Sequence, residues 1–531
     1  MKKTIMALLC AAMMLVTCSG AFAAEQVLSV YRANEPTTLD RVASTIDEAG
    51  KFILWDASEP LFRIEEGATV MSGAESYTYD EDTMTYTFTI RDNYWEDGVK
   101  VTAQDYLYSF QRMVDPNNAY GYISDIYCIE NAEAIYAGEK DVSELGVSAP
   151  DDKTLVIKLN DVNPAFLEVV PLYPQRKDFV EAMGDSYGID ADKFLSCGPF
   201  KLTAWEHNSY LTLEKNEYYW DAENVKLEKV NVYIITDSNA IYSAMKNGTL
   251  DYMETRNPDY ITEFQNDANF AVTDYVSPAL TFVLFNGQDE LLQTTQIRQA
   301  LSLAIDRQFF VDAMYSGVYL PAYGLTSWAI GIDGTALRDV APEPLKELAD
   351  SGVDPKELFI EGLTELGMDP DPSKVTITFS ISSSSTTDDT IALYQAMWGE
   401  TLGINVVADV SQWASFWSDC RAGDFQVGTL AWSGEIDVSF LFNLFLKENA
   451  QMPCFTYSDE FDELVKTANK SFDKDERLKL YAQAEKIMIS DLAAIAPVCY
   501  RVQKAVLRSN VQGWDYNVFS TAGHRHVSIA D

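Results

Sequence analysis

The chain has 531 residues, with 81 acidic and 39 basic side chains and a formal net charge of -42 at pH 7. A hydrophobic content of 47% is enough to form a large core, so a wholly disordered acidic protein is excluded, and the length indicates two or three domains. The acidity argues against nucleic-acid binding and against docking on an anionic membrane surface, because both require positive potential.

The N-terminal segment is typical of an export signal. Two lysines precede an apolar run, and the segment ends in Ala21-Phe22-Ala23, which fits an A-x-A cleavage site. We therefore expect residues 1–23 to be a signal peptide and the mature protein to be exported and periplasmic. The alternative is a lipoprotein box at 15–18, which would anchor the protein through Cys18 on the outer face of a membrane. No later apolar stretch reaches the roughly 20 residues needed to cross a bilayer.

Two segments in the first third of the chain have a period of two. Apolar residues alternate with threonines over 83–91, and residues 155–159 alternate in the same way. This pattern predicts short antiparallel strands with one buried face and one solvated face.

Helical segments lie further along the chain, at 238–247 before Gly248, at 296–305 and at 474–488. Residues 375–381 and 404–408 read as strands, and the helix expected at 388–402 between them ends at Gly403. A strand, a helix and a second strand form a β-α-β unit, which favours a parallel pair with a right-handed crossover. The sequence therefore predicts mixed α/β architecture in more than one domain.

Motifs for catalysis and metal binding are missing from the sequence. The three histidines, His207, His524 and His526, form no H-E-x-x-H, and there is no G-x-S-x-G, Walker A or G-x-G-x-x-G pattern. We expect no catalytic residue, no metal site and no cofactor, and we expect His524 and His526 to be exposed near the C-terminus. The five cysteines after residue 23 include no C-x-x-C pair, and their odd number leaves at least one without a partner in the chain.

Tryptophans gather in one stretch of the second half. Trp413 and Trp417 follow the strand expected at 404–408, and Trp432 follows another short strand expected at 427–431. Residues at the ends of parallel strands gather where ligands bind in open α/β sheets, so these side chains are candidates for a ligand-binding wall. The alternative is that they belong to the core.

Seven blocks of the sequence match one family in the correct order. They are NEPTTLD at 34–40, YTFTIRDNYWEDG with VTAQD within 86–105, CGPFKL at 197–202, KNEYYW at 215–220, IRQAL with AIDR within 297–307, TLGI at 401–404 and QGW at 512–514. On these blocks the chain resembles the extracytoplasmic solute-binding proteins of peptide ABC transporters, particularly the oligopeptide-binding proteins of solute-binding protein family 5. The resemblance covers nearly the whole mature chain.

The resemblance implies an α/β, two-lobed, three-domain periplasmic-binding-protein fold, a clamshell with mixed sheets and a ligand cleft between the lobes. Transferred to this chain, domain I comprises 24–59, 186–283 and 500–531. Domain II, at 60–185, packs on the same lobe. Domain III, at 284–499, forms the second lobe.

The resemblance also implies a function. The protein would be the substrate-binding receptor of an ABC importer, a monomer that captures short peptides and delivers them to a membrane permease with its ATPase subunits. The deep acidity would suit cationic peptides. Two alternatives remain open at this point: a receptor for a metal chelate or haem on the same fold, and an exported peptidase.

Candidate ligand-binding residues follow from the same resemblance. In the family an Asp shortly after a pocket Trp holds the ligand's α-ammonium; here Glu435 takes that place, with Asp437 as the competing register. Trp432 and Trp413 match the pocket-wall tryptophans, and Tyr122 matches a tyrosine that reaches in from the second domain. Ala431 and Ser433, which flank Trp432, complete the set.

Three departures from the family pattern concern the ligand's other end. The Arg that the family has three residues before the pocket Trp is Thr429 here, and the Cys after that Trp is Ser433, so that disulfide is absent. A His used for ligand carboxylates has no counterpart in 382–389. The peptide's C-terminal end must therefore be held differently, or the preferred ligand length differs.

Overall fold

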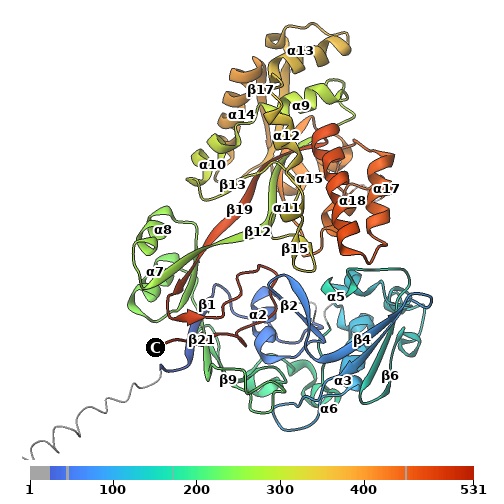
Figure 1. Ribbon diagram of the computed structural model, residues 1–531, viewed down its shortest axis with the longest axis vertical. Coiled ribbons are helices and arrows are strands. Elements are labelled where there is room, and N and C mark those ends of the chain that lie inside the picture. Colours follow the sequence, from blue (N-terminus) through green and yellow to red (C-terminus); the bar gives the residue numbers. More distant parts are fainter. Residues whose placement is uncertain (1–23, 44–46, 170–171, 449–450) are drawn as a thin grey trace, which may run out of the picture.

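The protein forms two lobes joined by long strands. The computed structural model describes residues 24–43, 47–169, 172–448 and 451–531, so the expected signal peptide and Cys18 lie outside the described residues. Lobe 1, at the bottom of Figure 1, holds both ends of the described chain, and lobe 2 stands above it. The expected α/β, two-lobed fold with mixed sheets is confirmed.

Lobe 1 contains two separate four-stranded sheets. The first has the order β1 (Val27–Arg32), β10 (Lys229–Ile234), β9 (Tyr210–Lys215) and β8 (Phe200–Glu206), with β1 and β10 parallel and the rest antiparallel. Its alternating apolar residues pack against helix α2 (Glu48–Ala57) in one core. Helices α7 (Ser238–Asn247) and α8 (Pro258–Gln265) pack beside it.

The second sheet of lobe 1 contains the antiparallel strands that the alternation predicted. Its order is β4 (Ala74–Asp80), β5 (Thr85–Ile90), β7 (Thr154–Lys158) and β6 (Val147–Asp151). It is not a simple meander, because β5 pairs with β7 and not with β6. Helix α3 (Ala103–Val114) packs against β6 and β7, and the shorter helices of this part are α4 (Ala132–Tyr136), α5 (Phe166–Val169) and α6 (Lys177–Met183). The hairpin β2 (Phe62–Glu65) and β3 (Ala68–Met71) faces lobe 2.

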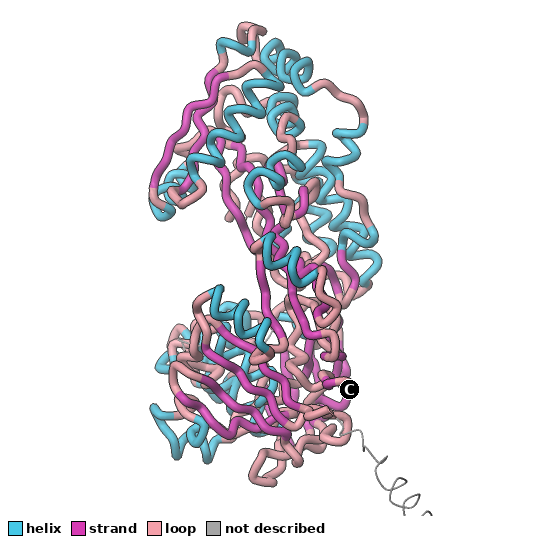
Figure 2. The backbone as a smooth tube through the Cα atoms, turned by 90° about the vertical axis from the view of Figure 1, so that its left-hand side faces the viewer, coloured by secondary structure: helices cyan, strands magenta, loops and turns pink. Residues whose placement is uncertain are grey.

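A seven-stranded sheet crosses between the lobes, as Figure 2 shows. Its order is β11 (Tyr252–Thr255), β19 (Ile495–Arg508), β12 (Phe270–Phe285), β18 (Val427–Ser433), β16 (Thr376–Ser382) and β17 (Asn405–Ser411), and β13 (Leu320–Pro321) also pairs with β19. Strands β16 and β17 are parallel, with α14 (Thr387–Leu402) between them, so the expected β-α-β unit is confirmed.

Further helices cover the lobe 2 part of this sheet. They are α9 (Thr295–Leu303), α10 (Arg307–Tyr315), α11 (Leu337–Val340), α12 (Pro344–Asp350), α13 (Pro355–Glu365), α15 (Trp413–Ala422), α16 (Ser439–Asn443), α17 (Asp459–Ala468) and α18 (Lys474–Lys486). Two small two-stranded sheets complete the fold: the hairpin of β14 (Gly331–Ile332) and β15 (Thr335–Ala336) in lobe 2, and β20 (Val511–Gln512) with β21 (Ser528–Ile529) in lobe 1.

The two crossing strands, β12 and β19, are paired antiparallel with two shifts of register, the larger of which is a bulge in β12. Val276 pairs with Val502 and Leu280 pairs with Tyr500, so β12 has extra residues between these points. Pro278 lies in this bulge, where its missing N–H costs no ladder hydrogen bond. The bulge marks the place where the connection between the lobes departs from regular sheet.

The lobes also meet away from the crossing strands, at what we call the hairpin contact. The Gly334 N–H of the β14–β15 turn donates to the Gly67 carbonyl of the β2–β3 turn at 2.8 Å, and the Thr69 N–H donates to Asp333 Oδ1 at 3.1 Å. Nearby, the rings of Tyr79 in lobe 1 and Phe472 in lobe 2 have centroids 4.9 Å apart.

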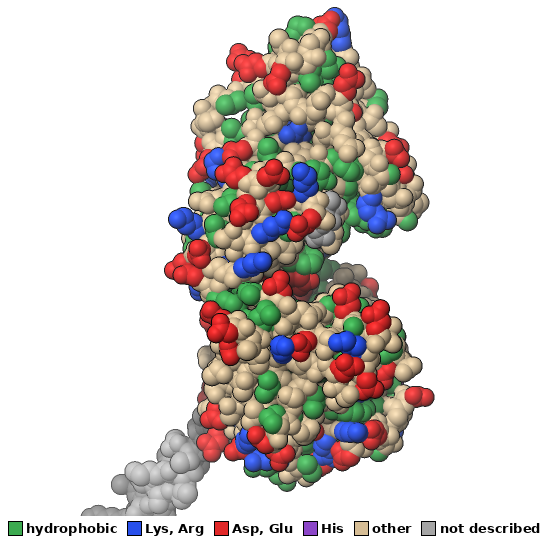
Figure 3. All heavy atoms as spheres, turned by 90° about the vertical axis from the view of Figure 1, so that its right-hand side faces the viewer, with side chains coloured by type: hydrophobic (Ala, Val, Ile, Leu, Met, Phe, Trp, Pro, Cys, Tyr) green, Lys and Arg blue, Asp and Glu red, His purple; other side chains and the backbone are tan. Residues whose placement is uncertain are grey.

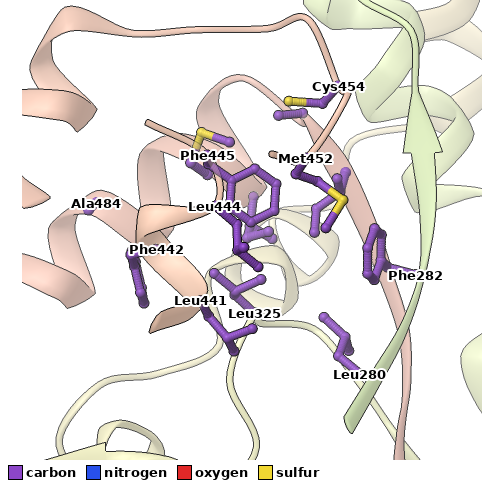
Figure 4. Close-up of a cluster of buried hydrophobic side chains, with 14 of the residues drawn as sticks. Leu280, Phe282, Leu325, Leu441, Phe442, Leu444, Phe445, Met452, Cys454 and Ala484 are labelled. Atoms are coloured by element: carbon purple, nitrogen blue, oxygen red, sulfur yellow. The ribbon is translucent and has the colours of Figure 1, made fainter. Parts of the chain in front are cut away.

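The core of lobe 2 extends up to the crossing strands. Figure 4 shows Leu280 and Phe282 of β12 facing Leu325, Leu441 and Met452. All of these side chains are buried. The segment that follows β18 is therefore attached to a packed core rather than to a free loop.

Some details differ from the expectations. Strand β18 runs to Ser433, because Trp432 and Ser433 pair with Leu280 and Ala279, so Trp432 lies within the strand instead of after it. The expectation that His524 is exposed is wrong: it is 3% exposed, because its backbone N–H and its Nδ1 both bond to buried Asp56. The five described cysteines are all free, four of them buried.

We expect Asp473→Ala to lower the free energy of unfolding by about 1 kcal/mol. Asp473 is the N-cap of α18, and its carboxylate accepts from the Glu476 N–H at 3.0 Å. Urea unfolding followed by circular dichroism measures the effect. Asp475→Ala, which removes an exposed acid from the same helical turn, is the matched control. An equal loss in both variants would contradict the capping role.

Candidate functional site

A cavity of about 800 Å³ lies between the lobes and is lined from both. Figure 3 shows the hollow that separates the two lobes at the molecular surface. Lobe 1 contributes charged and aromatic side chains, and lobe 2 contributes the segment after β18. The cavity lining includes Arg41, Glu48, Lys51, Tyr122, Asp125, Glu168, Pro278, Ser433, Gly434, Glu435 and Asp437.

A second hollow of about 730 Å³ lies beside the first, on lobe 1. The two share Glu48, Trp55 and Val518 in their walls. The size of each is within the range of small-molecule sites. Together they offer an extended space instead of a single compact pocket.

The segment that carries Glu435 is held on both sides by backbone hydrogen bonds. The Gly434 N–H donates to the Pro278 carbonyl in the bulge of β12 at 3.1 Å. The Gly331 N–H donates to the Ile436 carbonyl at 3.0 Å, and the Val438 N–H donates to the Gly331 carbonyl at 3.1 Å. Glu435 therefore projects from a fixed backbone between two buried neighbours, Gly434 and Ile436.

Gly434 is required at its position by close packing. A Cβ there would lie 2.4 Å from the Ile330 Cδ1 and 3.1 Å from the Leu441 Cδ1. Any other residue would displace the segment that positions Glu435.

The carboxylate of Glu435 has no hydrogen bond or ion pair with any residue that the structure describes. Burial in the cavity raises its pKa above the ordinary value of 4.5, and the charges of Asp125 and Glu48 act in the same direction. Lys51 opposes them. A cationic group entering the cavity would relieve this repulsion and restore the charged form.

Asp437 lies two residues further on and has a different environment. It is 1% exposed, and both of its carboxylate oxygens accept from Arg477 Nη2 at 2.9 Å. It also accepts from the Ser439 N–H at 2.8 Å. Its carboxylate is therefore already neutralised within lobe 2, whereas that of Glu435 is not.

Three tryptophans form a ladder on lobe 2. Trp413, the first residue of α15, is 48% exposed and stacks on Trp417 with ring centroids 5.9 Å apart and an interplanar angle of 4°. Trp417 in turn lies 5.6 Å from Trp432 of β18. The ladder presents flat aromatic surface next to the strand that leads into the cavity wall.

Tyr122 enters the cavity lining from lobe 1. It precedes a short 3-10 turn at Ile123–Ile126, and its ring lies 4.3 Å below the Lys51 ammonium. Lys51 also pairs with Glu48 at 2.7 Å. This wall therefore carries an aromatic ring with a cation that already has a counter-ion.

The structure brings together four of the seven candidate residues. Tyr122, Ser433, Glu435 and Asp437 line the cavity, whereas Ala431, Trp432 and Trp413 lie outside its lining. Sequence reasoning missed the charged groups of lobe 1, which are Arg41, Glu48, Lys51, Asp125 and Glu168. No local motif marks them, because their common location depends on elements far apart in the chain.

The described residues include no group of three or more His, Cys, Asp or Glu side chains arranged to hold a metal ion. Within the same residues, no helix is both long and apolar enough to span a membrane. The fold and the cavity define the class of protein: a two-lobed binding protein with its ligand space between the lobes.

Comparison with known proteins identifies the family. The model of the bacterial extracellular solute-binding proteins, family 5, matches residues 70–452, which is most of the chain. The protein belongs to this family. It is therefore an extracytoplasmic solute-binding protein and not an enzyme, which removes the exported peptidase from consideration.

Individual relatives agree with this assignment. The chain is 30% identical over 482 residues to the oligopeptide-binding protein OppA of Bacillus subtilis, covering 88% of this chain and 86% of that protein. The periplasmic murein tripeptide binding protein MppA, in its unliganded open form, has a TM-score of 0.85 at 24% identity over 96% of this chain and 98% of that one. OppA of Listeria monocytogenes bound to peptide has a TM-score of 0.63 at 25% identity, covering 96% and 100%.

Proposed function

We propose that the protein captures short peptides between its lobes and delivers them to the permease of an ABC importer. The observation that carries the proposal is the unpaired carboxylate of Glu435 in the interlobe cavity. A free peptide amino terminus is the cation that such a group would hold. The relatives named above, which are oligopeptide- and murein-peptide-binding proteins, support a peptide as the ligand.

The shape of the site supports a ligand held by its main chain. Strand β18 is extended up to Ser433, and an extended peptide offers backbone groups at a regular spacing whatever its sequence. Pairing with these groups provides affinity without side-chain selectivity. Trp413, Trp432, Ala431 and Ser433 then form the surroundings of the ligand's side chains, with Tyr122 opposite.

Between the two acids, we assign the amino-group anchor to Glu435. Asp437 is buried and bonded to Arg477, so its use would require breaking an internal ion pair. Acids also outnumber bases in the cavity lining, five to two among Glu48, Asp125, Glu168, Glu435, Asp437, Arg41 and Lys51. This excess supports a preference for peptides with basic side chains.

We expect Glu435→Gln to weaken the binding of free-amine peptides by about tenfold or more. A charge-assisted hydrogen bond contributes on the order of 1.5–3 kcal/mol, and about 1.4 kcal/mol corresponds to tenfold. Isothermal titration calorimetry with alanine peptides of two to five residues, at neutral pH, measures the change.

The same peptides with an acetylated amino terminus are the control. They should bind the unaltered protein weakly and should lose little further affinity in Glu435→Gln. If the unaltered protein binds free-amine and acetylated peptides equally, Glu435 does not hold an amino group.

The remaining assignments extend this proposal. We propose domain I at 24–59, 186–283 and 500–531, domain II at 60–185 and domain III at 284–499, which places both changes of lobe within β12 and β19. We propose that residues 1–23 direct export to the periplasm, with a lipid on Cys18 as the alternative, and that the receptor acts as a monomer. N-terminal sequencing and mass spectrometry of the mature protein test the processing site.

A further inference from the structure

The interlobe cavity is lined by two cationic side chains, Arg41 and Lys51, which differ in their counter-ions. Lys51 Nζ lies 2.7 Å from Glu48 Oε1. Arg41 forms no ion pair with any carboxylate in the described part of the chain, and its Nη1 is buried without a hydrogen-bond partner. A buried, unpartnered N–H group of a charged side chain is costly and calls for a ligand.

The turn that carries Arg41 is anchored by the hydrogen bonds of the preceding residue, Asp40. Asp40, its neighbour, is buried and accepts from both terminal nitrogens of Arg112 at 2.8 Å. The same carboxylate accepts from Gln175 Nε2 at 2.9 Å and from the Val42 N–H at 3.1 Å. Asp40 is therefore fully engaged and is unable to neutralise Arg41, while it fixes the backbone from which Arg41 projects.

Aromatic rings set the direction of the guanidinium. Its central carbon lies 5.7 Å from the ring centre of Tyr120 and 5.8 Å from that of Tyr122. Such contacts orient a guanidinium while leaving its N–H edges available. Burial raises the pKa of Asp125 and the charge of Arg41 opposes that rise, but the two side chains do not form an ion pair.

We propose that Arg41 binds a carboxylate of the ligand, so that an unpaired cation on lobe 1 and the unpaired anion Glu435 on lobe 2 receive the two ends of a zwitterion. This inference rests on the proposed function and adds a second polar contact to it. A guanidinium can donate two parallel N–H groups to a carboxylate, and such charge-assisted hydrogen bonds are about twice as strong as those between neutral groups. It also supplies a group for the ligand's C-terminal end, for which the sequence offered no candidate.

The carboxylate could come from the C-terminus of the peptide or from an acidic side chain. Alanine peptides as free acids and as C-terminal amides report on the first source. Amidated peptides that carry one glutamate report on the second. Both sources share the chemistry proposed for Arg41, and the comparison between these probes assigns the source.

The test compares the unaltered protein with Arg41→Gln by isothermal titration calorimetry. We expect the unaltered protein to bind one carboxylate-bearing probe at least tenfold more tightly than the matching probe that lacks the carboxylate, and Arg41→Gln to reduce that ratio to about one. The preference for a free amino terminus over an acetylated one should persist in Arg41→Gln. An unchanged carboxylate ratio in Arg41→Gln would overturn the proposal.

Two further variants keep the result interpretable. Arg41→Lys retains the charge and should give an intermediate ratio, which covers the case in which Arg41→Gln fails to fold. Arg421→Gln removes an exposed arginine outside the cavity lining and should change nothing. If the unaltered protein binds none of the peptides, the proposed function fails and this inference fails with it; if it binds them with a carboxylate preference that Arg41 does not control, only this inference fails.

Discussion

Replacing Asp437 with alanine is expected to lower the free energy of unfolding by about 3–5 kcal/mol. The change leaves the guanidinium of Arg477, which is 3% exposed, buried without its counter-ion. Arg477 would retain its hydrogen bond from Nε to the Ala468 carbonyl at 3.2 Å and its contact with the ring of Tyr481, neither of which carries a negative charge. Urea unfolding followed by circular dichroism measures the loss.

The paired variant Glu435→Gln separates the structural acid from the proposed ligand anchor. Because Glu435 has no hydrogen bond or ion pair with any described residue, its replacement should change the free energy of unfolding by less than about 0.5 kcal/mol. The double variant Asp437→Leu with Arg477→Met removes both charges and should recover much of the loss. A stable Asp437→Ala protein with weakened peptide binding would reverse the two roles.

A second large effect is expected from pH at the hairpin contact. Glu168 of α5 in lobe 1 is packed against lobe 2, and its Oε2 is buried without a hydrogen-bond partner. Burial raises its pKa to about 8, with further repulsion from Asp437 and Asp333, while Arg477 and the Asp333 N–H oppose the rise. Glu168 therefore favours its neutral form while the lobes are held together beside Asp333 of the hairpin contact.

The sign of the pH dependence follows from this shift. The ordinary pKa of Glu168 is 4.5, so the contact is at full strength below about pH 4.5 and weakens as pH rises from about 4.5 to about 8. At pH 7 this shift leaves the contact weaker than it is in acid by on the order of 3 kcal/mol. We expect Glu168→Gln to hold the contact at neutral pH as firmly as the unaltered protein holds it in acid.

Hydrogen exchange read by mass spectrometry detects the contact directly, because the Gly334 and Thr69 N–H groups donate across it. Comparison of Glu168→Gln with the unaltered protein at each pH cancels the intrinsic effect of pH on exchange. Glu181→Gln, an exposed acid of the same lobe, is the control. If the two proteins show the same difference at pH 5 and pH 8, Glu168 does not govern the contact.

The sequence predicted the elements that depend on local patterns. The alternation at 83–91 gives β5, and the order of strand, helix and strand at 375–408 gives the parallel pair β16 and β17. Gly403 ends α14 with a φ of +84°, as a C-terminal glycine should. These features depend only on residues close together in the sequence, so they can be predicted directly from it.

The charges of the site are not predictable in this way. Whether Asp437 or Glu435 is free depends on Arg477, which lies 40 residues away in sequence. His524 was expected to be exposed because it lies near the end of the chain. It is instead buried, with hydrogen bonds to Asp56, which is 468 residues away in the sequence. Ion pairs of this kind are decided by tertiary packing, which a single sequence does not reveal.

The bond from Gly434 to Pro278 has a mechanical consequence. It ties the backbone beside Glu435 to the larger of the two interruptions in the pairing of β12 with β19. A ligand that displaces the Glu435 segment therefore acts directly on this bulge in the strands that join the lobes, without a chain of contacts through the interior of either lobe. In this receptor the proposed ligand anchor and the bulge in the connecting strands are therefore joined by a single backbone hydrogen bond.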